Sequence, residues 1–470
     1  MLLAALLAVA GLLTQAASAQ GREASVTIGL GGNLVAGTWN PLQVTVRDAP
    51  AATLSVRIDE GDLVSGPRVV RYQAAVPGGS GVTVFSDDVY VPPFRTLAWT
   101  LAGTDGVLAS GSLGARDADG RPLQVVVSAN PGAWRAAFGA DARVVDVAAS
   151  QLPGRAAAYD GVATLLIDGT AAAPRAESVA AAAAGGVNVV LAGALPSSQA
   201  GLGALAGAGV RRLGAGQVRR VEASDDAVAS ALAVWRPAER ARLVSALAAA
   251  PLVRAPRSAP QPLVLSVAAA YALSTLLALR FGGRPGVVAA LALAVVVSVA
   301  GWRFLRPPAA ELSAQRTLML GGGELALALS VEERLTLPAG DVSVSEPARP
   351  LSELPYRTDA NGTHVALARW HGVSLALRPS LAEAALRFEG GRLRNAGSAV
   401  LRNVYVIGVG EQGTLAPGAS RVVRPGEEAA GPADVARLRA LLPAGSALAE
   451  GPETLWVALP PVLSDAGGRP

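Results

Sequence analysis

The stretch VATLLID at residues 162–168 is followed by an Ala-rich stretch at 177–184 and by VNVVL at 187–191. The first and third stretches are continuous apolar runs, which are typical of strands buried on both faces of a parallel sheet. The middle stretch predicts a helix over 177–184 that ends at Gly185 and Gly186. A strand, a helix and a second strand in this order predict a parallel sheet covered by helices.

The same rhythm extends outward from this unit in both directions. Residues 123–127 predict a short buried strand, 143–147 predict another strand, and 131–138 predict a helix between them. Residues 225–250 predict a helix that Pro237 interrupts. We therefore expect a three-layer α/β domain over residues 119–250.

Alternating patterns flank this domain on both sides. Residues 42–46 (LQVTV) and 54–58 (LSVRI) alternate apolar and polar side chains, and Gly, Pro and Asp separate such runs. They predict a β-sandwich over 20–118. Alternation resumes later and predicts a C-terminal β-sandwich-like domain over 311–430. A short helix and a tail are expected over 431–470.

Three apolar segments indicate a membrane protein. Residues 1–19 resemble a signal peptide that ends in Ala17-Ser18-Ala19. Residues 262–279 and 285–302 carry no charge over 18 positions each, and a helix of that length reaches about 27 Å. They predict a transmembrane helical hairpin over 262–303, joined to the α/β domain by a linker at 251–261.

Orientation follows from the signal peptide. The signal peptide exports the chain up to the first span, and the hairpin then returns the chain to the same side of the membrane. Both large parts should therefore lie outside the cytoplasm, with only the turn 280–284 in the cytoplasm. The sequence thus predicts a multidomain α+β protein of the cytoplasmic (inner) membrane, with the lipid bilayer as one partner.

Composition excludes several chemistries. The 470 residues include no cysteine and no lysine, two histidines and 40 arginines. Thiol nucleophiles, disulfides, cysteine-ligated metals and lysine Schiff bases are therefore impossible. The net charge is only +4, the arginines are scattered, and aromatic residues make up 4 %, so we expect no nucleic-acid partner.

The densest basic cluster comprises Arg211, Arg212, Arg219 and Arg220 around Gly214-Ala215-Gly216, which suggests a hairpin. One interpretation is a surface for lipid headgroups or an acidic partner. The other, which we favour, is a charged sheet edge that blocks the addition of further strands. The sequence leaves both open.

Other candidate sites have little support. Residues 408–413 (GVGEQG) match a dinucleotide-binding fingerprint, but Pro417 and Gly418 follow where a helix must begin. His364 and His371 are seven apart on one expected strand and so face opposite sides. Asp160 and Asp168 bracket the strand 162–167 without companion ligands. We expect no cofactor and no metal. Trp39 is expected to pack in the sandwich core, with sugar stacking as the alternative.

The order of the parts resembles uncharacterised bacterial envelope proteins that combine an exported β-sandwich, a degenerate class I glutamine-amidotransferase-like domain and transmembrane helices. The segments that carry this resemblance are Leu152-Pro153-Gly154, Tyr159-Asp160-Gly161-Val162, Leu165-Leu166-Ile167-Asp168, Gly185-Gly186-Val187-Asn188-Val189-Val190, Leu393-Arg394-Asn395-Ala396-Gly397 and Leu401-Arg402-Asn403-Val404-Tyr405-Val406. The resemblance implies partners among MoxR-type ATPases and von Willebrand factor A proteins. Amidotransferases need a cysteine nucleophile, so that activity is not carried over.

These observations predict a non-enzymatic, membrane-anchored envelope protein whose exported domains form a protein-binding scaffold. Two alternatives stay open. One is a protein that binds or processes cell-wall carbohydrate, and the other is a subunit of a membrane transport complex.

Overall fold

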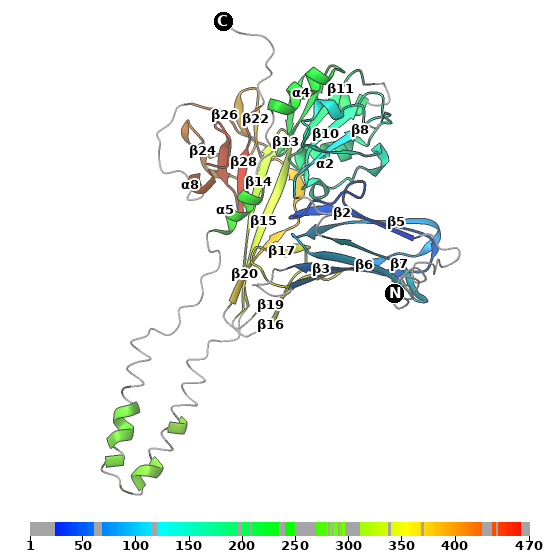
Figure 1. Cartoon of the computed structure of the whole chain (residues 1–470). Coiled ribbons are helices and arrows are strands. Elements are labelled where there is room, and N and C mark those ends of the chain that lie inside the picture. Colours follow the sequence, from blue (N-terminus) through cyan, green and yellow to red (C-terminus); the bar gives the residue numbers. More distant parts are fainter. Residues whose placement is uncertain are drawn as a thin grey trace, which may run out of the picture.

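Strands make up 52 % of the structure, a computed structural model of the chain. It describes residues 24–60, 68–114, 120–130, 132–195, 200–206, 209–234, 240–249, 311–336, 340–367, 371–424, 435–438 and 440–461, and scattered positions between 269 and 296. The long hairpin of β14 (Glu311–Gly322) and β15 (Leu325–Thr336) runs along the middle of the molecule (Figure 1).

The first part is a sandwich of two sheets in which every strand pair except one is antiparallel. The smaller sheet has the order β1 (Ala24–Ile28), β2 (Thr38–Ala49), β5 (Gly79–Val91). The larger sheet has the order β16 (Gly340–Val344), β19 (Gly362–Leu367), β18 (Tyr356–Asp359), β4 (Arg68–Val76), β3 (Ala52–Glu60), β6 (Thr96–Gly103), β7 (Gly106–Gly114). Alternate residues of β2 and β3, such as Leu42, Val44, Leu54 and Val56, are buried between the sheets.

Residues from the last third of the chain complete this sandwich. Strand β18 pairs with β4 in parallel, with Arg357 opposite Arg71 and Thr358 opposite Tyr72. Arg68 and Glu353 form an ion pair beside this contact. The expected ranges 20–118 and 311–430 therefore share one hydrogen-bonded sheet.

The second part is a six-stranded sheet with helices on both faces. Its order is β12 (Val210–Leu213), β13 (Gly216–Val221), β11 (Asn188–Ala192), β10 (Val162–Asp168), β8 (Leu123–Val127), β9 (Arg143–Asp146), and all but β12 are parallel. Leu165 and Ile167 pack with α2 (Ala176–Ala184) and α3 (Ala200–Ala206), whereas Leu166 packs with α4 (Asp225–Val234) on the other face.

Two local expectations for this part are confirmed and one is wrong. The strand at 162–167 and the helix at 177–184 are present as β10 and α2. In place of the helix expected at 131–138, the described residues 132–138 hold only a 3-10 turn, η2 (Arg135–Ala137). Further 3-10 turns are η3 (Ala149–Gln151) and η4 (Ala156–Tyr159).

The third part is a nine-stranded sheet faced by a small one. The large sheet has the order β17 (Ala348–Pro350), β20 (His371–Leu377), β15, β14, β28 (Thr454–Ala458), β27 (Ala447–Glu450), β24 (Leu401–Val406), β25 (Gly410–Leu415), with β21 (Ser380–Glu383) also on β15. The small sheet has the order β22 (Leu386–Glu389), β23 (Arg392–Asn395), β26 (Ser420–Val422). Two helices, α5 (Arg240–Ala248) and α8 (Val435–Leu438), also cover the large sheet.

Arginine side chains join the parts. Arg143 of β9 donates to the carbonyl oxygen of Leu34 at 2.8 Å. Arg240, at the start of α5, forms an ion pair with Asp160 at 3.1 Å and also donates to the carbonyl oxygen of Gly185. Helix α5 then packs Leu243 and Leu247 against β15 residues such as Leu329. The α/β sheet is therefore fixed both to the sandwich and to the nine-stranded sheet.

The expected transmembrane hairpin is wrong. Among the described residues, no helix is long and apolar enough to cross a membrane. Most of the range 262–303 lies outside the described residues. The predicted fold class of a membrane protein and the predicted inner-membrane location both depended on this hairpin, so they are wrong as well. The expected signal peptide at 1–19 and linker at 251–261 lie outside the described residues.

Candidate functional site

Two hairpin turns meet where the α/β sheet touches the nine-stranded sheet. The amide of Gly214, between β12 and β13, donates to the carbonyl oxygen of Gly322 at 2.8 Å. A Cβ on Gly322 would lie 2.5 Å from Cγ of Arg212 and 2.6 Å from the Gly214 carbonyl oxygen. Only glycine permits this approach. The sequence Gly321-Gly322-Gly323-Glu324 is thus the local signal for the contact.

A cavity of about 280 Å³, here named the arginine cavity, lies beside these turns. Its lining residues come from β12, the β14–β15 turn, β22 and the end of the chain's last described stretch: Val210, Arg211, Arg212, Gly323, Glu324, Arg387, Phe388, Glu389, Leu459 and Pro461. Three segments far apart in the sequence therefore contribute charged groups to one small space.

The charges in the arginine cavity do not balance. Arg211 lies 3.8 Å from Glu324, and Arg387 lies 2.6 Å from Glu389. Arg212 has no carboxylate partner within the described part of the chain, and burial lowers the pKa of its guanidinium. The Nε atoms of Arg212 and Arg387 are both buried, and neither has a hydrogen-bond acceptor among the described residues. Buried donors of this kind normally have a partner.

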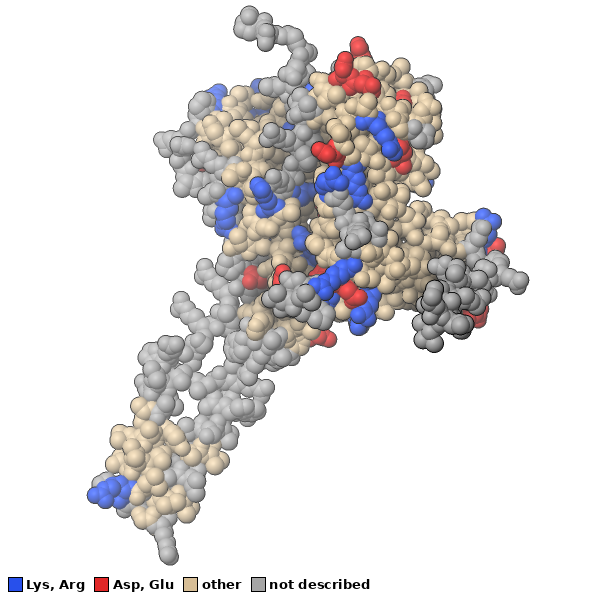
Figure 2. Space-filling view, in the orientation of Figure 1, with Lys and Arg blue, Asp and Glu red and all other residues tan. Residues whose placement is uncertain are grey.

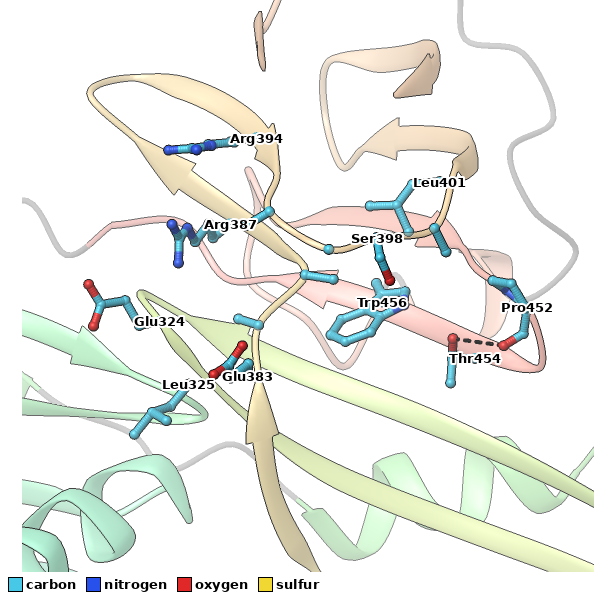
Figure 3. A pocket seen from close by; sticks show the side chains of 15 residues that line it. Glu324, Leu325, Glu383, Arg387, Arg394, Ser398, Leu401, Pro452, Thr454 and Trp456 are labelled. Carbon is cyan, nitrogen blue, oxygen red and sulfur yellow. Dashed lines mark hydrogen bonds between the residues drawn. The ribbon is translucent and has the colours of Figure 1, made fainter. Parts of the chain in front are cut away.

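A larger hollow of about 770 Å³, here named the Trp456 groove, adjoins the cavity and shares Glu324 and Arg387 with it. Figure 3 shows Arg387 and Glu324 at one end, Thr454 and Pro452 at the other, and Trp456 between them. The remaining lining residues are Leu325, Glu383, Ala384, Ala385, Arg394, Ala396, Gly397, Ser398, Ala399 and Leu401. The groove thus combines an aromatic and aliphatic floor with charges of both signs.

The charged end of the groove is held by ion pairs. Arg394 of β23 donates to Oε2 of Glu389 at 2.7 Å, and Arg387 pairs with Oε1 at 2.6 Å. The hydrogen bond from Arg394 and the charges of both arginines hold the pKa of Glu389 below its usual range. Glu389 is therefore ionised at neutral pH and keeps both guanidinium groups in place.

Strand pairing divides the predicted basic cluster. In the β12–β13 hairpin Arg211 is opposite Val218 and Arg212 is opposite Gln217, so Arg212 and Arg219 share one face and Arg211 and Arg220 the other. Arg211 and Arg212 line the arginine cavity, whereas Arg220 is exposed. On the face in Figure 2 basic and acidic side chains are scattered among uncharged ones, and no continuous basic stripe crosses its described residues.

Asp168 lies where a doubly wound sheet usually binds its ligand. The strand order reverses between β8 and β10, and Asp168 ends β10. Its carboxylate accepts hydrogen bonds from the Trp134 indole (3.0 Å), the Ser128 hydroxyl (3.0 Å) and the Thr170 amide (2.9 Å). Burial acts to raise the pKa of Asp168, but these hydrogen bonds outweigh it and lower the pKa. The indole of Trp134 thus occupies this crevice.

Asp160 and Trp39 are structural. Oδ2 of Asp160 accepts the Trp39 amide at 3.1 Å, while its other oxygen pairs with Arg240. The Trp39 ring is buried, with Tyr90 edge-on at 5.7 Å between ring centres. A ring in this position has no free face on which a sugar could stack.

The histidines and the glycine motif lie in β-structure away from the groove. His364 of β19 contacts Asp359 at 3.2 Å, and His371 begins β20 in another sheet. The expectation of one strand through both histidines is wrong, because the chain changes sheet between them. Residues 408–409 lie in the turn between β24 and β25, and residues 410–413 begin β25. Within the described ranges no group of three His, Cys, Asp or Glu side chains could hold a metal ion.

Sequence reasoning missed Arg387, Arg394 and Trp456, which lie on ordinary alternating strands. No protein-family model, curated protein or solved structure matches this chain. The groove and the cavity are therefore interpreted from their own geometry.

Proposed function

We propose that this protein is a non-catalytic binding protein and that the Trp456 groove receives a segment of another protein. The observation that carries the proposal is the groove itself, about 770 Å³, in which a tryptophan lies between a charged end at Arg387 and Glu324 and an uncharged end at Thr454 and Pro452. Volumes of this size suit a ligand of drug size or a short peptide segment.

The chemistry of the lining favours binding over catalysis. Arginine and tryptophan are the residues that most often dominate protein interfaces, and both line this groove. Arginine keeps its proton and cannot act as a general base at neutral pH. Arg387 and Arg394 are fixed by Glu389, so they are oriented before a partner arrives and little side-chain entropy is lost on binding.

Site-specific photo-crosslinking in living cells tests the proposal. The photoreactive residue benzoylphenylalanine replaces Glu383, an exposed side chain on the groove. The matched control carries it at Ser112, which is exposed on β7 at the far end of the sandwich. We expect one discrete protein adduct at position 383, absent at position 112. MoxR-type ATPases and von Willebrand factor A proteins are the first identities to test.

A blocking variant separates groove binding from chance proximity. Ser398 is exposed on the groove wall, so Ser398→Trp fills the groove without burying a new group in the core. We expect the adduct at position 383 to disappear in this background while circular dichroism stays unchanged. Equal adducts with and without Ser398→Trp, or equal adducts at positions 383 and 112, would overturn the proposal. Saturable binding of purified muropeptides would favour the carbohydrate alternative.

A further inference from the structure

We propose that the arginine cavity binds a small oxyanion between the guanidinium groups of Arg212 and Arg387. The site lies next to the Trp456 groove but does not require that the groove bind a protein. Its chemistry is that of phosphate, sulfate or a single carboxylate group.

Two buried donors without an acceptor belong to arginines that line this one small space. The Nε–H groups of Arg212 and Arg387 come from β12 and β22, which belong to different sheets, and both residues line the same cavity. Leaving a buried donor of a charged group without an acceptor is costly, so an acceptor from outside the chain is favoured here. An oxyanion offers several acceptor atoms in the separation that guanidinium forks match.

The local charge count leaves one positive charge for such an anion. Three arginines and two glutamates line the cavity. Glu324 is 3.8 Å from Arg211 and Glu389 is 2.6 Å from Arg387. Arg212 is therefore the lining arginine without an acidic partner among the described residues. A singly or doubly charged oxyanion would supply the missing partner.

The size and walls of the cavity set the ligand class. Its volume of about 280 Å³ lies at the lower end of the range for small-molecule sites, so it suits one anionic group rather than a nucleotide. Phe388 and the buried Leu459 are apolar residues of its lining. Apolar walls reduce the screening by water and strengthen each charge-assisted hydrogen bond.

The cavity is also formed before an anion arrives. The Gly214–Gly322 hydrogen bond holds the two turns together, and the close packing of Gly322 on Arg212 fixes the stem of that side chain. Glu389 holds Arg387. A preformed pair of donors loses little conformational entropy when the ligand binds.

Calorimetry and thermal unfolding with inorganic phosphate test the inference. The full chain is titrated with sodium phosphate against sodium chloride of equal ionic strength, with sodium sulfate and sodium acetate as further arms. We expect a saturable 1:1 isotherm and a phosphate-dependent rise in Tm for the wild-type protein. Preference among the three anions distinguishes a tetrahedral from a planar oxyanion.

Charge-matched variants locate the site. Arg212→Gln and Arg220→Gln remove the same charge from the same hairpin, but Arg220 is exposed and lies outside the cavity. We expect Arg212→Gln to abolish the response and Arg220→Gln to retain it. Arg212→Lys keeps the charge and loses the Nε donor, so we expect affinity to fall roughly tenfold, as for one lost charge-assisted hydrogen bond. Circular dichroism checks that each variant is folded.

Two results would overturn the inference. Equal responses of the wild-type protein and Arg212→Gln would show a general ionic effect. No saturable response to any of the three anions would show that water satisfies the two Nε–H groups. Neither result would bear on crosslinking at position 383, so failure of the anion site and failure of the groove proposal remain distinguishable.

Discussion

Arg155 reaches from the α/β sheet into the sandwich and contacts the fully buried carboxylate of Asp88 through two hydrogen bonds, at 2.7 Å and 3.1 Å. Asp88 lies on β5, and Arg155 directly precedes η4. Burial raises the pKa of Asp88, against the opposing hydrogen bond and charge of Arg155. This pair therefore supports the joint between the first two parts.

Arg155→Met should destabilise the protein by about 3 kcal/mol, because it leaves a buried carboxylate without its cation. Urea unfolding measures the change. Arg175→Met is the matched control, since Arg175 and its partner Glu177 are exposed and 4.0 Å apart. Such surface pairs contribute little. Similar losses in both variants would contradict the assignment.

The deficit of Arg155→Met should depend on pH in a defined direction. Without Arg155 the folded-state pKa of Asp88 rises further above its unfolded value of about 3.9. A carboxyl group with a raised folded pKa loses stability as the pH rises through that range. We therefore expect the deficit to be smallest near pH 4 and to grow toward pH 7. Adding Asp88→Asn should remove this pH dependence.

Asp168→Asn should weaken the α/β part by about 1–2 kcal/mol, because the buried indole N–H and hydroxyl lose a charged acceptor. The folded pKa of Asp168 is lowered, so its contribution is complete above pH 4 and is lost as the pH falls through the folded pKa. The difference between wild type and variant should thus be constant from pH 5 to 8 and shrink below pH 4. The exposed Asp341 provides the control, Asp341→Asn. Unfolding curves across this pH range decide the matter.

Gly322→Ala should separate the two hairpin turns. The new methyl group would lie within 2.6 Å of the Gly214 carbonyl oxygen, and overpacking of this kind costs about 1–3 kcal/mol. Hydrogen exchange at the Gly214 amide, which donates across the contact, should accelerate together with the loss of stability. Gly340→Ala is the control, because a Cβ there meets no atom within 4 Å. Unchanged exchange in Gly322→Ala would show that the turns can shift at no cost.

Arg212→Met and Arg387→Met should change stability in opposite directions in anion-free buffer. Removing Arg212 removes a desolvated cation that has no acidic partner in the described chain, so we expect a gain of about 1 kcal/mol. Removing Arg387 takes one of two arginine partners from Glu389, so we expect a loss. Thermal unfolding measures both. A loss of stability in Arg212→Met would mean that its aliphatic stem contributes more than its charge costs.

Local sequence patterns predicted the strands whose burial follows one regular pattern along their whole length. Strand β10 is buried on both faces, so each of its positions is apolar or small except at its end. The run at 162–167 could therefore be predicted as a strand from the sequence. Strands β2 and β3 are buried on one face only, which gives the period-two pattern at 42–46 and 54–58. These signals depend on neighbours within a few residues.

The sequence does not indicate which strands pair with each other. Strands β16, β18 and β19 alternate as any half-buried strand does, and nothing in their sequence indicates that β18 pairs with β4. The groove arginines Arg387 and Arg394 likewise look like an ordinary solvated strand face until Glu389 and Trp456 are placed beside them. The apolar runs at 262–303 predicted a membrane hairpin from composition alone, and no described helix is long and apolar enough to cross a membrane.

The parallel pairing of β18 with β4 has a consequence for how this protein is made. Arg68 and Glu353, which pair beside that contact, are 285 positions apart. At about 5–20 residues per second, a ribosome needs roughly 15–60 s to deliver the second residue after the first. Through that interval β4 leaves the ribosome with one edge unpaired. The nascent sandwich is therefore exposed to intermolecular strand addition until β18 is synthesised and pairs with β4.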